Sequence, residues 1–148
     1  MSGQTADIFP DILLVRRLQR EAAGLTAGRA ATALHDLEVD RVPLQRSLDD
    51  AVTGYRRNLS EGPFNPAITD GWRMLIGEQA AILEDHDGQL DLARKDASEA
   101  KQEWHKSQGR EELARDLARQ VARRRQRRND ERHMADHADL LAQRRRVL

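Results

Sequence analysis

The sequence predicts an all-α protein: a long two-helix antiparallel coiled-coil hairpin with a longer second helix, in a single domain over residues 1–148. Three observations predict it. The chain is 34% charged and only 3% aromatic, which disfavours a compact domain with a large core. Apolar residues recur at alternating steps of three and four in two long stretches, which is typical of coiled coils. One short Gly/Pro-rich segment between the stretches is the clear break in this pattern.

The first helix is expected over about residues 10–59. Pro10 or Asp11 can open it, because proline is tolerated in the first turn. Pro43 lies inside the stretch and should kink or locally break the helix. A phase shift is expected near Gly24 and Gly28. The apolar stripe of this helix is predicted to comprise Leu14, Leu18, Ala22, Leu25, Leu34, Leu37, Leu44, Leu48, Ala51, Val52, Tyr55 and Leu59.

A loop is expected over about residues 60–68, followed by a second helix over about 69–143 that Thr69 or Asp70 can cap. The second helix carries a narrow apolar seam that another helix must cover. The seam comprises Trp72, Ile76, Gln79, Leu83, His86, Leu90, Ala93, Ala97, Ala100, Trp104, Ser107, Glu111, Ala114, Ala118 and Val121. Both Trp residues are expected to be large side chains within the core.

Folding the chain about residues 64–65 sets an approximate register between the two helices. It predicts that Tyr55 faces the region of Met74, that Leu37 faces Leu92 and that Leu25 faces Trp104. The first helix begins near residue 10, opposite about residue 119. About 25 C-terminal residues of the second helix are therefore left without an intrachain partner.

Charge is unevenly distributed along a chain of zero net charge. Residues 1–109 hold 13 Arg/Lys and 18 Asp/Glu, whereas residues 110–148 hold 12 and 7. The basic end includes an arginine run, which we define as Arg123, Arg124, Arg125, Arg127 and Arg128. The run can be a solvated face, or it can bind an acidic protein surface, for which planar guanidinium groups are well suited. Nucleic-acid binding is less favoured, because the run contains no aromatic residue and acidic residues flank it.

Several function classes find no support in the sequence. There is no Cys, no apolar run long enough to cross a bilayer and no signal-peptide pattern. No nucleotide-binding loop and no nucleophile–base set is present, so we expect neither enzymatic activity nor a cofactor. His133 and His137 lie one helical turn apart in a pattern resembling H-x-x-E-H, with Asp136 where Glu is expected. Without a third ligand, this pair is expected to be solvated helix surface and not a metal site.

The stretch Tyr55-Arg56-Arg57-Asn58-Leu59 leads into the loop, Ile68-Thr69 and Trp72 follow, and a second Trp stands at position 104. This arrangement resembles the FliJ family of flagellar export proteins and, more loosely, the YscO proteins of injectisomes. The resemblance is clearest from Leu48 to Trp104.

The resemblance implies a non-enzymatic stalk that acts in type III protein export, located in the cytoplasm and at the cytosolic face of the inner membrane only through its partners. Such proteins bind a hexameric export ATPase and promote its assembly, contact the cytosolic domain of an FlhA-like export gate, and bind export chaperones. Carried over to this chain, Arg16, Arg17 and the arginine run would contact the ATPase ring. Leu48, Tyr55 and Leu83 would contact the gate.

Two other interpretations remain open. One is a generic coiled-coil adaptor, including a dimer paired through Met134, Ala138 and Leu141. A stalk, in contrast, is expected to be a monomer when isolated. The other is an arginine-rich coiled coil that binds nucleic acid.

Overall fold

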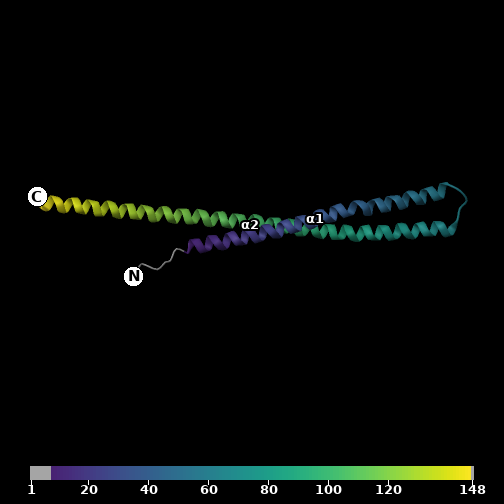
Figure 1. Ribbon diagram of the computed structural model, residues 1–148, viewed down its shortest axis with the longest axis horizontal. Coiled ribbons are helices and arrows are strands. Elements are labelled where there is room, and N and C mark those ends of the chain that lie inside the picture. The colour runs from purple at the N-terminus through teal and green to yellow at the C-terminus, as the bar shows by residue number, and fades with distance from the viewer. Residues whose placement is uncertain (1–7, 148) are drawn as a thin grey trace. The chain divides into compact units, whose positions relative to one another are not determined.

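The computed structural model describes residues 8–147, so Asp7 and the rest of the N-terminal stretch lie outside the described part. Two helices, α1 (Phe9–Ser60) and α2 (Pro66–Val147), make up the described chain apart from Ile8 and the five-residue loop 61–65 (Figure 1). The prediction of an all-α hairpin with a longer second helix is confirmed. The predicted limits were short of the observed ones, most for α2, which begins three residues earlier and ends four residues later than expected.

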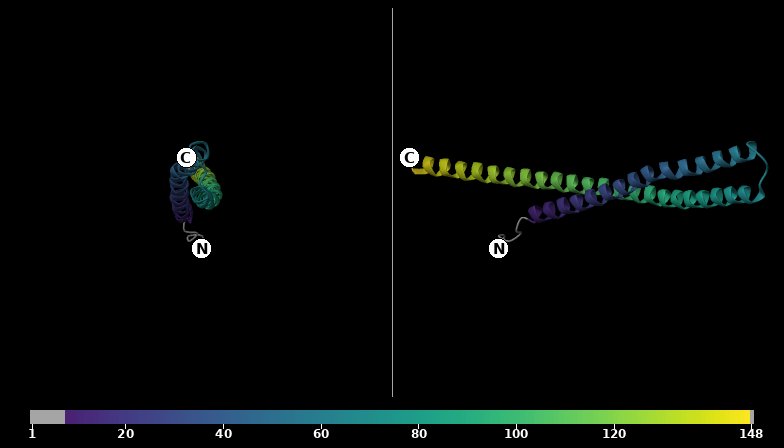
Figure 2. Two further views of the ribbon diagram at one scale, coloured as in Figure 1. Left: turned by 90° about the vertical axis from the view of Figure 1, so that its right-hand side faces the viewer. Right: turned by 45° about the vertical axis from the view of Figure 1, so that its right-hand side comes forward.

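Contacts divide the chain into two units, through both of which the two helices run. The loop unit comprises Ala22–Trp104. The terminal unit comprises Met1–Glu21 and His105–Leu148, of which residues 8–21 and 105–147 are described. Within the loop unit, α1 and α2 run antiparallel and are joined by the loop (Figure 2).

The start of α2 is capped by Asn65, and not by Thr69 or Asp70 as predicted. The backbone N–H of Ala67 donates to Asn65 Oδ1 at 3.0 Å, which is the interaction that an N-cap side chain provides. Pro66 occupies the first helical position, where the absence of an N–H costs nothing. Thr69 lies one turn further on, where its N–H donates to the carbonyl of Asn65 at 3.0 Å. Its side chain is buried in the hairpin.

The seam predicted for α2 is confirmed. All of its fifteen residues are buried or partly buried, and between residues 71 and 121 only Asp87 and Gln108 join them. His86 is 9% exposed, and its Nε2 lies 2.7 Å from the carbonyl oxygen of Leu37. Because a carbonyl only accepts, Nε2 must carry the proton in this hydrogen bond. The polar seam residue thus ties α2 to the backbone of α1.

The seam of α1 was predicted correctly from Leu34 to Tyr55 and wrongly before that. Leu14, Leu18, Ala22 and Leu25 are exposed, as is Leu59. Their expected places are taken by one other leucine, Leu13, and otherwise by smaller or charged residues, namely Arg16, Arg20, Ala23, Gly24, Ala27 and Ala30. Apart from the adjacent pair Ala23 and Gly24, these positions continue the steps of three and four as far as Leu34, so the predicted phase shift does not occur.

Two residues of α2, Trp104 and Glu111, explain which face of α1 packs against α2. Trp104 needs a small neighbour, and its Nε1 lies 3.1 Å from where a Cβ on Gly24 would stand. Glu111 is buried and needs a cation, which Arg20 supplies at 2.9 Å. Leucines at these places would clash with the indole or leave a carboxylate buried without a counter-charge.

Pro43 does not break α1, which is helical on both sides of it. A proline inside a helix removes the hydrogen bond to the carbonyl of residue i−4, here Val39. Both residues are exposed, and Val39 is 53% exposed. Water can therefore reach the carbonyl that Pro43 leaves without its helical partner.

The predicted register was close near the loop and at Trp104. Tyr55 meets Arg73, next to the expected Met74, with Arg73 Nε donating to the phenol oxygen at 3.4 Å. Trp104 meets Gly24, next to the expected Leu25. In the middle of the hairpin the expectation was wrong, because Leu37 meets His86, whereas Leu92 is 65% exposed.

Candidate functional surfaces

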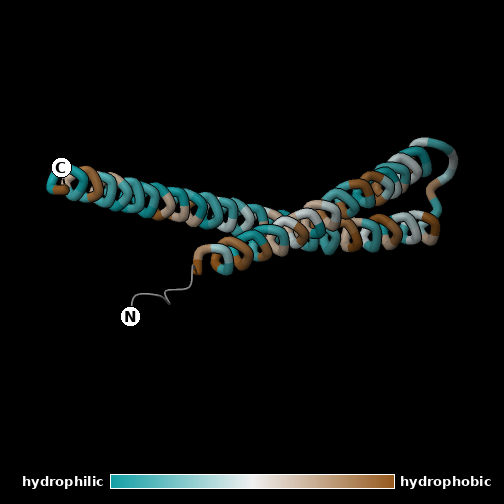
Figure 3. The backbone as a smooth tube through the Cα atoms, turned by 60° about the vertical axis from the view of Figure 1, so that its left-hand side comes forward, coloured by the Kyte–Doolittle hydropathy of each residue, from teal (hydrophilic) through white to brown (hydrophobic). Residues whose placement is uncertain are grey.

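The most unusual surface of the terminal unit is the C-terminal segment, residues 122–147 of α2, in which every residue is exposed. The positions that would continue the seam beyond Val121 hold Arg125, Arg128 and Arg132. Charged side chains at these positions remove the apolar seam that a second helix would cover. Hydrophilic residues accordingly dominate this end of α2 (Figure 3). The whole arginine run lies here and is accessible to a partner.

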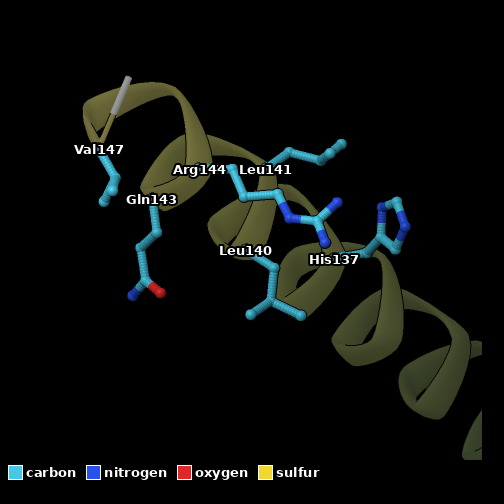
Figure 4. A pocket seen from close by; sticks show the side chains of 6 residues that line it. All are labelled: His137, Leu140, Leu141, Gln143, Arg144 and Val147. Atoms are coloured by element: carbon cyan, nitrogen blue, oxygen red, sulfur yellow. The ribbon is translucent and has the colours of Figure 1, made fainter.

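The C-terminal segment also exposes large apolar side chains. Met134 is 72% exposed, and Leu140 and Leu141 are 62% and 50% exposed. Leu140 and Leu141 project from different sides of the helix, as Figure 4 shows, so they belong to different faces. The hollow around them is lined by residues of this one helix, His137 to Val147. An open hollow on a single helix cannot enclose a small ligand, but it can receive another protein surface.

A buried carboxylate held by two arginines joins the helices of the terminal unit. The side chain of Glu111 is 5% exposed, and its oxygens lie 2.9 Å from Arg20 Nε and 2.6 Å from Arg115 Nη2. Arg20 comes from α1, whereas Arg115 lies one turn further along α2. Because a buried charge is costly without a counter-charge, this cluster fixes which residue of α1 stands opposite Glu111.

Arg16 and Arg17, predicted as ring contacts, lie in α1 of the same unit as the arginine run. Arg16 is partly buried and donates from Nη1 to Gln19 Oε1 at 3.2 Å. Arg17 is exposed and pairs with Glu21 at 3.0 Å. Arg17 is therefore the more exposed of the two.

The terminal unit also exposes large apolar side chains, of which Leu14 and Leu18 were predicted to lie in the seam. Such side chains on a slender pair of helices are a signal for protein partners. They are Ile8, Leu14, Val15 and Leu18 of the N-terminal part, and Leu113 and Leu117 of α2.

The three residues proposed for the export gate lie in the seam of the loop unit. Leu83 is 8% exposed, so it packs inside the closed hairpin. Leu48 and Tyr55 are partly buried, and the hydroxyl of Tyr55 accepts a hydrogen bond from Arg73. A partner can therefore reach the exposed parts of Leu48 and Tyr55, whereas Leu83 is buried within the hairpin.

Both Trp residues lie in the seam, as predicted, but they are partly buried and not fully enclosed. The six-membered ring of Trp72 covers Gly54, where a Cβ would lie 2.7 Å from Cζ3 and 3.0 Å from Cζ2. Beside Trp104, small residues of both helices leave an open recess, including Gly28, Ala31 and Ala97. The sequence did not predict that Gly24 and Gly54 face the two Trp residues. The signal that could have predicted it is a glycine in one helix at the position opposite a large aromatic residue in the other.

An ion pair crosses the middle of the loop unit. Arg41 Nε lies 2.7 Å from Asp87 Oδ1. The hydrogen bond and the positive charge of Arg41 lower the pKa of Asp87 below its ordinary range. The two side chains are 38% and 42% exposed, so water screens the pair. The ion pair therefore contributes more to fixing which residues of the two helices face each other than to the stability of the hairpin.

Nothing in residues 8–147 brings together three or more His, Cys, Asp or Glu side chains in a metal-binding arrangement. His133 and His137 both lie on exposed helix surface. Within the same residues, neither helix is long and apolar enough to cross a membrane. Comparison with protein-family models, curated proteins and solved structures finds no match.

Proposed function

We propose that this chain is the non-enzymatic stalk of a type III export apparatus, most similar to the FliJ family of flagellar export proteins. In this role it binds the hexameric export ATPase, promotes its assembly, and links it to an FlhA-like export gate and to export chaperones. The observation that carries the proposal is the resemblance over Leu48–Trp104, on a helical hairpin whose longer helix ends in an exposed basic segment.

The terminal unit is the proposed ring contact. It offers guanidinium groups of the arginine run, which can pair with acidic residues of the ATPase subunits. It also offers exposed apolar side chains, among them Leu14, Leu18, Leu113 and Leu117, which a ring interior can bury. Arg17 lies on the surface of the same unit.

The proposed mechanism needs no catalytic group from this chain. A two-helix stalk is asymmetric, whereas the ring around it is built from identical subunits. Bound inside the ring, the stalk contacts different subunits differently and favours one arrangement of their conformations over others. Hydrolysis then becomes cooperative around the ring.

The loop unit is the proposed contact for the export gate, through the accessible edges of Leu48 and Tyr55. In the proposed role, the protein acts in the cytoplasm and reaches the cytosolic face of the inner membrane only through its partners.

The test is ATP hydrolysis and hexamer formation by the export ATPase of the same genome, with and without the protein. In the test variant, all five arginines of the arginine run are changed to Glu, and in the matched control all five are changed to Lys. Because these side chains are exposed on a single helix, both variants should stay as helical as the parent protein, which circular dichroism checks.

We expect the parent protein to stimulate hexamer formation and hydrolysis, the Glu variant to lose the effect, and the Lys variant to keep most of it. If the folded parent protein has no effect at saturating concentration, the stalk proposal is wrong. If the Glu variant stimulates as well as the parent, the ring contact lies elsewhere in the terminal unit.

A further inference from the structure

One face of the C-terminal segment carries a stripe whose two ends have opposite charge. We define the terminal stripe as Glu131, Met134, Ala138, Leu141 and Arg145, which follow one another at steps of three and four. These steps keep residues on one face of a helix. All five are exposed, with Met134 at 72% and Leu141 at 50% (Figure 4 shows Leu141). The stripe is acidic at one end, apolar in the middle and basic at the other end.

We propose that the terminal stripe is occupied by the same stripe of a second copy of this chain, running antiparallel about an axis near Ala138. Reversal about Ala138 brings Glu131 opposite Arg145 of the second copy, and Arg145 opposite Glu131. The same reversal sets Met134 opposite Ala142, and Leu141 opposite Ala135, two alanines that border the terminal stripe of the second copy. Large side chains thus meet small ones, which is how helices interdigitate.

The charges at the two ends of the terminal stripe favour a second copy of this chain as the partner, and they favour its antiparallel orientation. A parallel second copy would place Glu131 against Glu131 and Arg145 against Arg145, which is unfavourable. An acidic or a basic partner of another kind would match only one end. The antiparallel second copy matches both ends and covers the apolar middle, which would otherwise stay in water.

The pairing is weak, because the stripe is short. It spans about 15 residues, or about 22 Å of helix, so it buries less than the roughly 1,200 Å² of a stable interface. The chain is therefore monomeric when dilute and pairs at higher concentration. The arginine run precedes the stripe and stays outside the contact. This inference does not depend on the proposed function.

Charge reversal within one chain tests the pairing. Glu131→Arg places Arg opposite Arg at both ends of the pair, and Arg145→Glu places Glu opposite Glu. In sedimentation equilibrium, we expect each single variant to weaken the dimer about tenfold, since it replaces two attractions with two repulsions. The double variant restores the attraction in reversed order, so its dimer should be about as strong as that of the parent.

Off-stripe controls carry the same changes of charge. Asp136→Arg lies on the opposite face of the helix, and Arg132→Glu lies to one side of the stripe; both should leave the dimer within about twofold of the parent. If the controls weaken the dimer as much as the stripe variants, net charge and not the stripe governs association, and the proposal is wrong. A parent protein that stays monomeric at the highest soluble concentration also overturns it.

Single cysteines test the direction, because the chain has none of its own. Ala138→Cys lies at the axis, so two copies should form a disulfide readily under oxidation. Met134→Cys lies about 12 Å along the helix from its own equivalent in an antiparallel pair and should not cross-link. Equal cross-linking at both positions would indicate a parallel pair and contradict the proposal.

Discussion

Substituting alanine for glycine tests how Trp72 packs on the hairpin. Gly54 lies within α1, where alanine is favoured over glycine by about 1 kcal/mol. However, the new Cβ would meet the ring of Trp72, with Cζ3 at 2.7 Å and Cζ2 at 3.0 Å and with Cη2 closer still. Overpacking by one methyl group costs about 1–3 kcal/mol in a packed core. The steric cost wins, so Gly54→Ala should destabilise the hairpin by about 1 kcal/mol.

Two other glycines provide graded controls. Nothing lies within 4 Å of a Cβ built on Gly77, so Gly77→Ala should stabilise the protein by about 1 kcal/mol. Gly24 is intermediate, because Trp104 Nε1 lies at 3.1 Å and Cδ1 at 3.5 Å. Gly24→Ala should therefore change stability little. The expected order of stability is Gly77→Ala, then Gly24→Ala, then Gly54→Ala.

Thermal unfolding followed by circular dichroism measures the series. For a chain of this length, 1 kcal/mol corresponds to a shift in Tm of about 3 °C, so Gly77→Ala and Gly54→Ala should differ by about 6 °C. In a Trp72→Leu background, Gly54→Ala should become stabilising, because the clash is gone. If Gly54→Ala raises Tm as much as Gly77→Ala does, Trp72 does not cover Gly54 and the helix pairing near the loop is different.

Two further predictions concern charged pairs. Glu111→Ala removes the close carboxylate partner of Arg20 and leaves only the longer pair with Glu21 at 3.8 Å. We expect a loss of about 2–3 kcal/mol, reduced because Arg20 and Arg115 are partly solvated, and faster hydrogen exchange in residues 9–21. Unchanged exchange there would count against the cluster as the tie between the helices. The pKa of Asp87 is lowered by the hydrogen bond from Arg41. The pair therefore stabilises the folded state at pH values above the unfolded pKa of about 4, and this stabilisation is lost as the pH falls through the lower folded pKa. Asp87→Asn should therefore reduce the fall in urea midpoint between about pH 6 and pH 3, and equal falls in both proteins would refute the role of the pair.

The proposed surfaces were only partly predictable from the sequence. The basic end was visible because charge is read directly from composition, and the exposure of the arginine run follows from arginines standing where the seam would continue. The exposed leucines of the terminal unit could not be foreseen, because Leu14 and Leu18 have the spacing of a seam and only the partner helix decides whether they face it. Leu83 was likewise proposed as a contact although it is buried within the hairpin.

The sequence by itself determined the fold class, the position of the turn and the buried face of α2. It did so because a regular heptad of apolar residues, bounded by glycine and proline, has one favourable arrangement over a long stretch. Only the tertiary structure decided which face of α1 meets that seam in its first half. The apolar pattern there offered leucines, but Trp104 required the space at Gly24, and Glu111 required the charge of Arg20. Steric fit and the cost of a buried charge outweighed leucine burial, so the first half of α1 turned alanines and arginines inward and left Leu14, Leu18 and Leu25 in water.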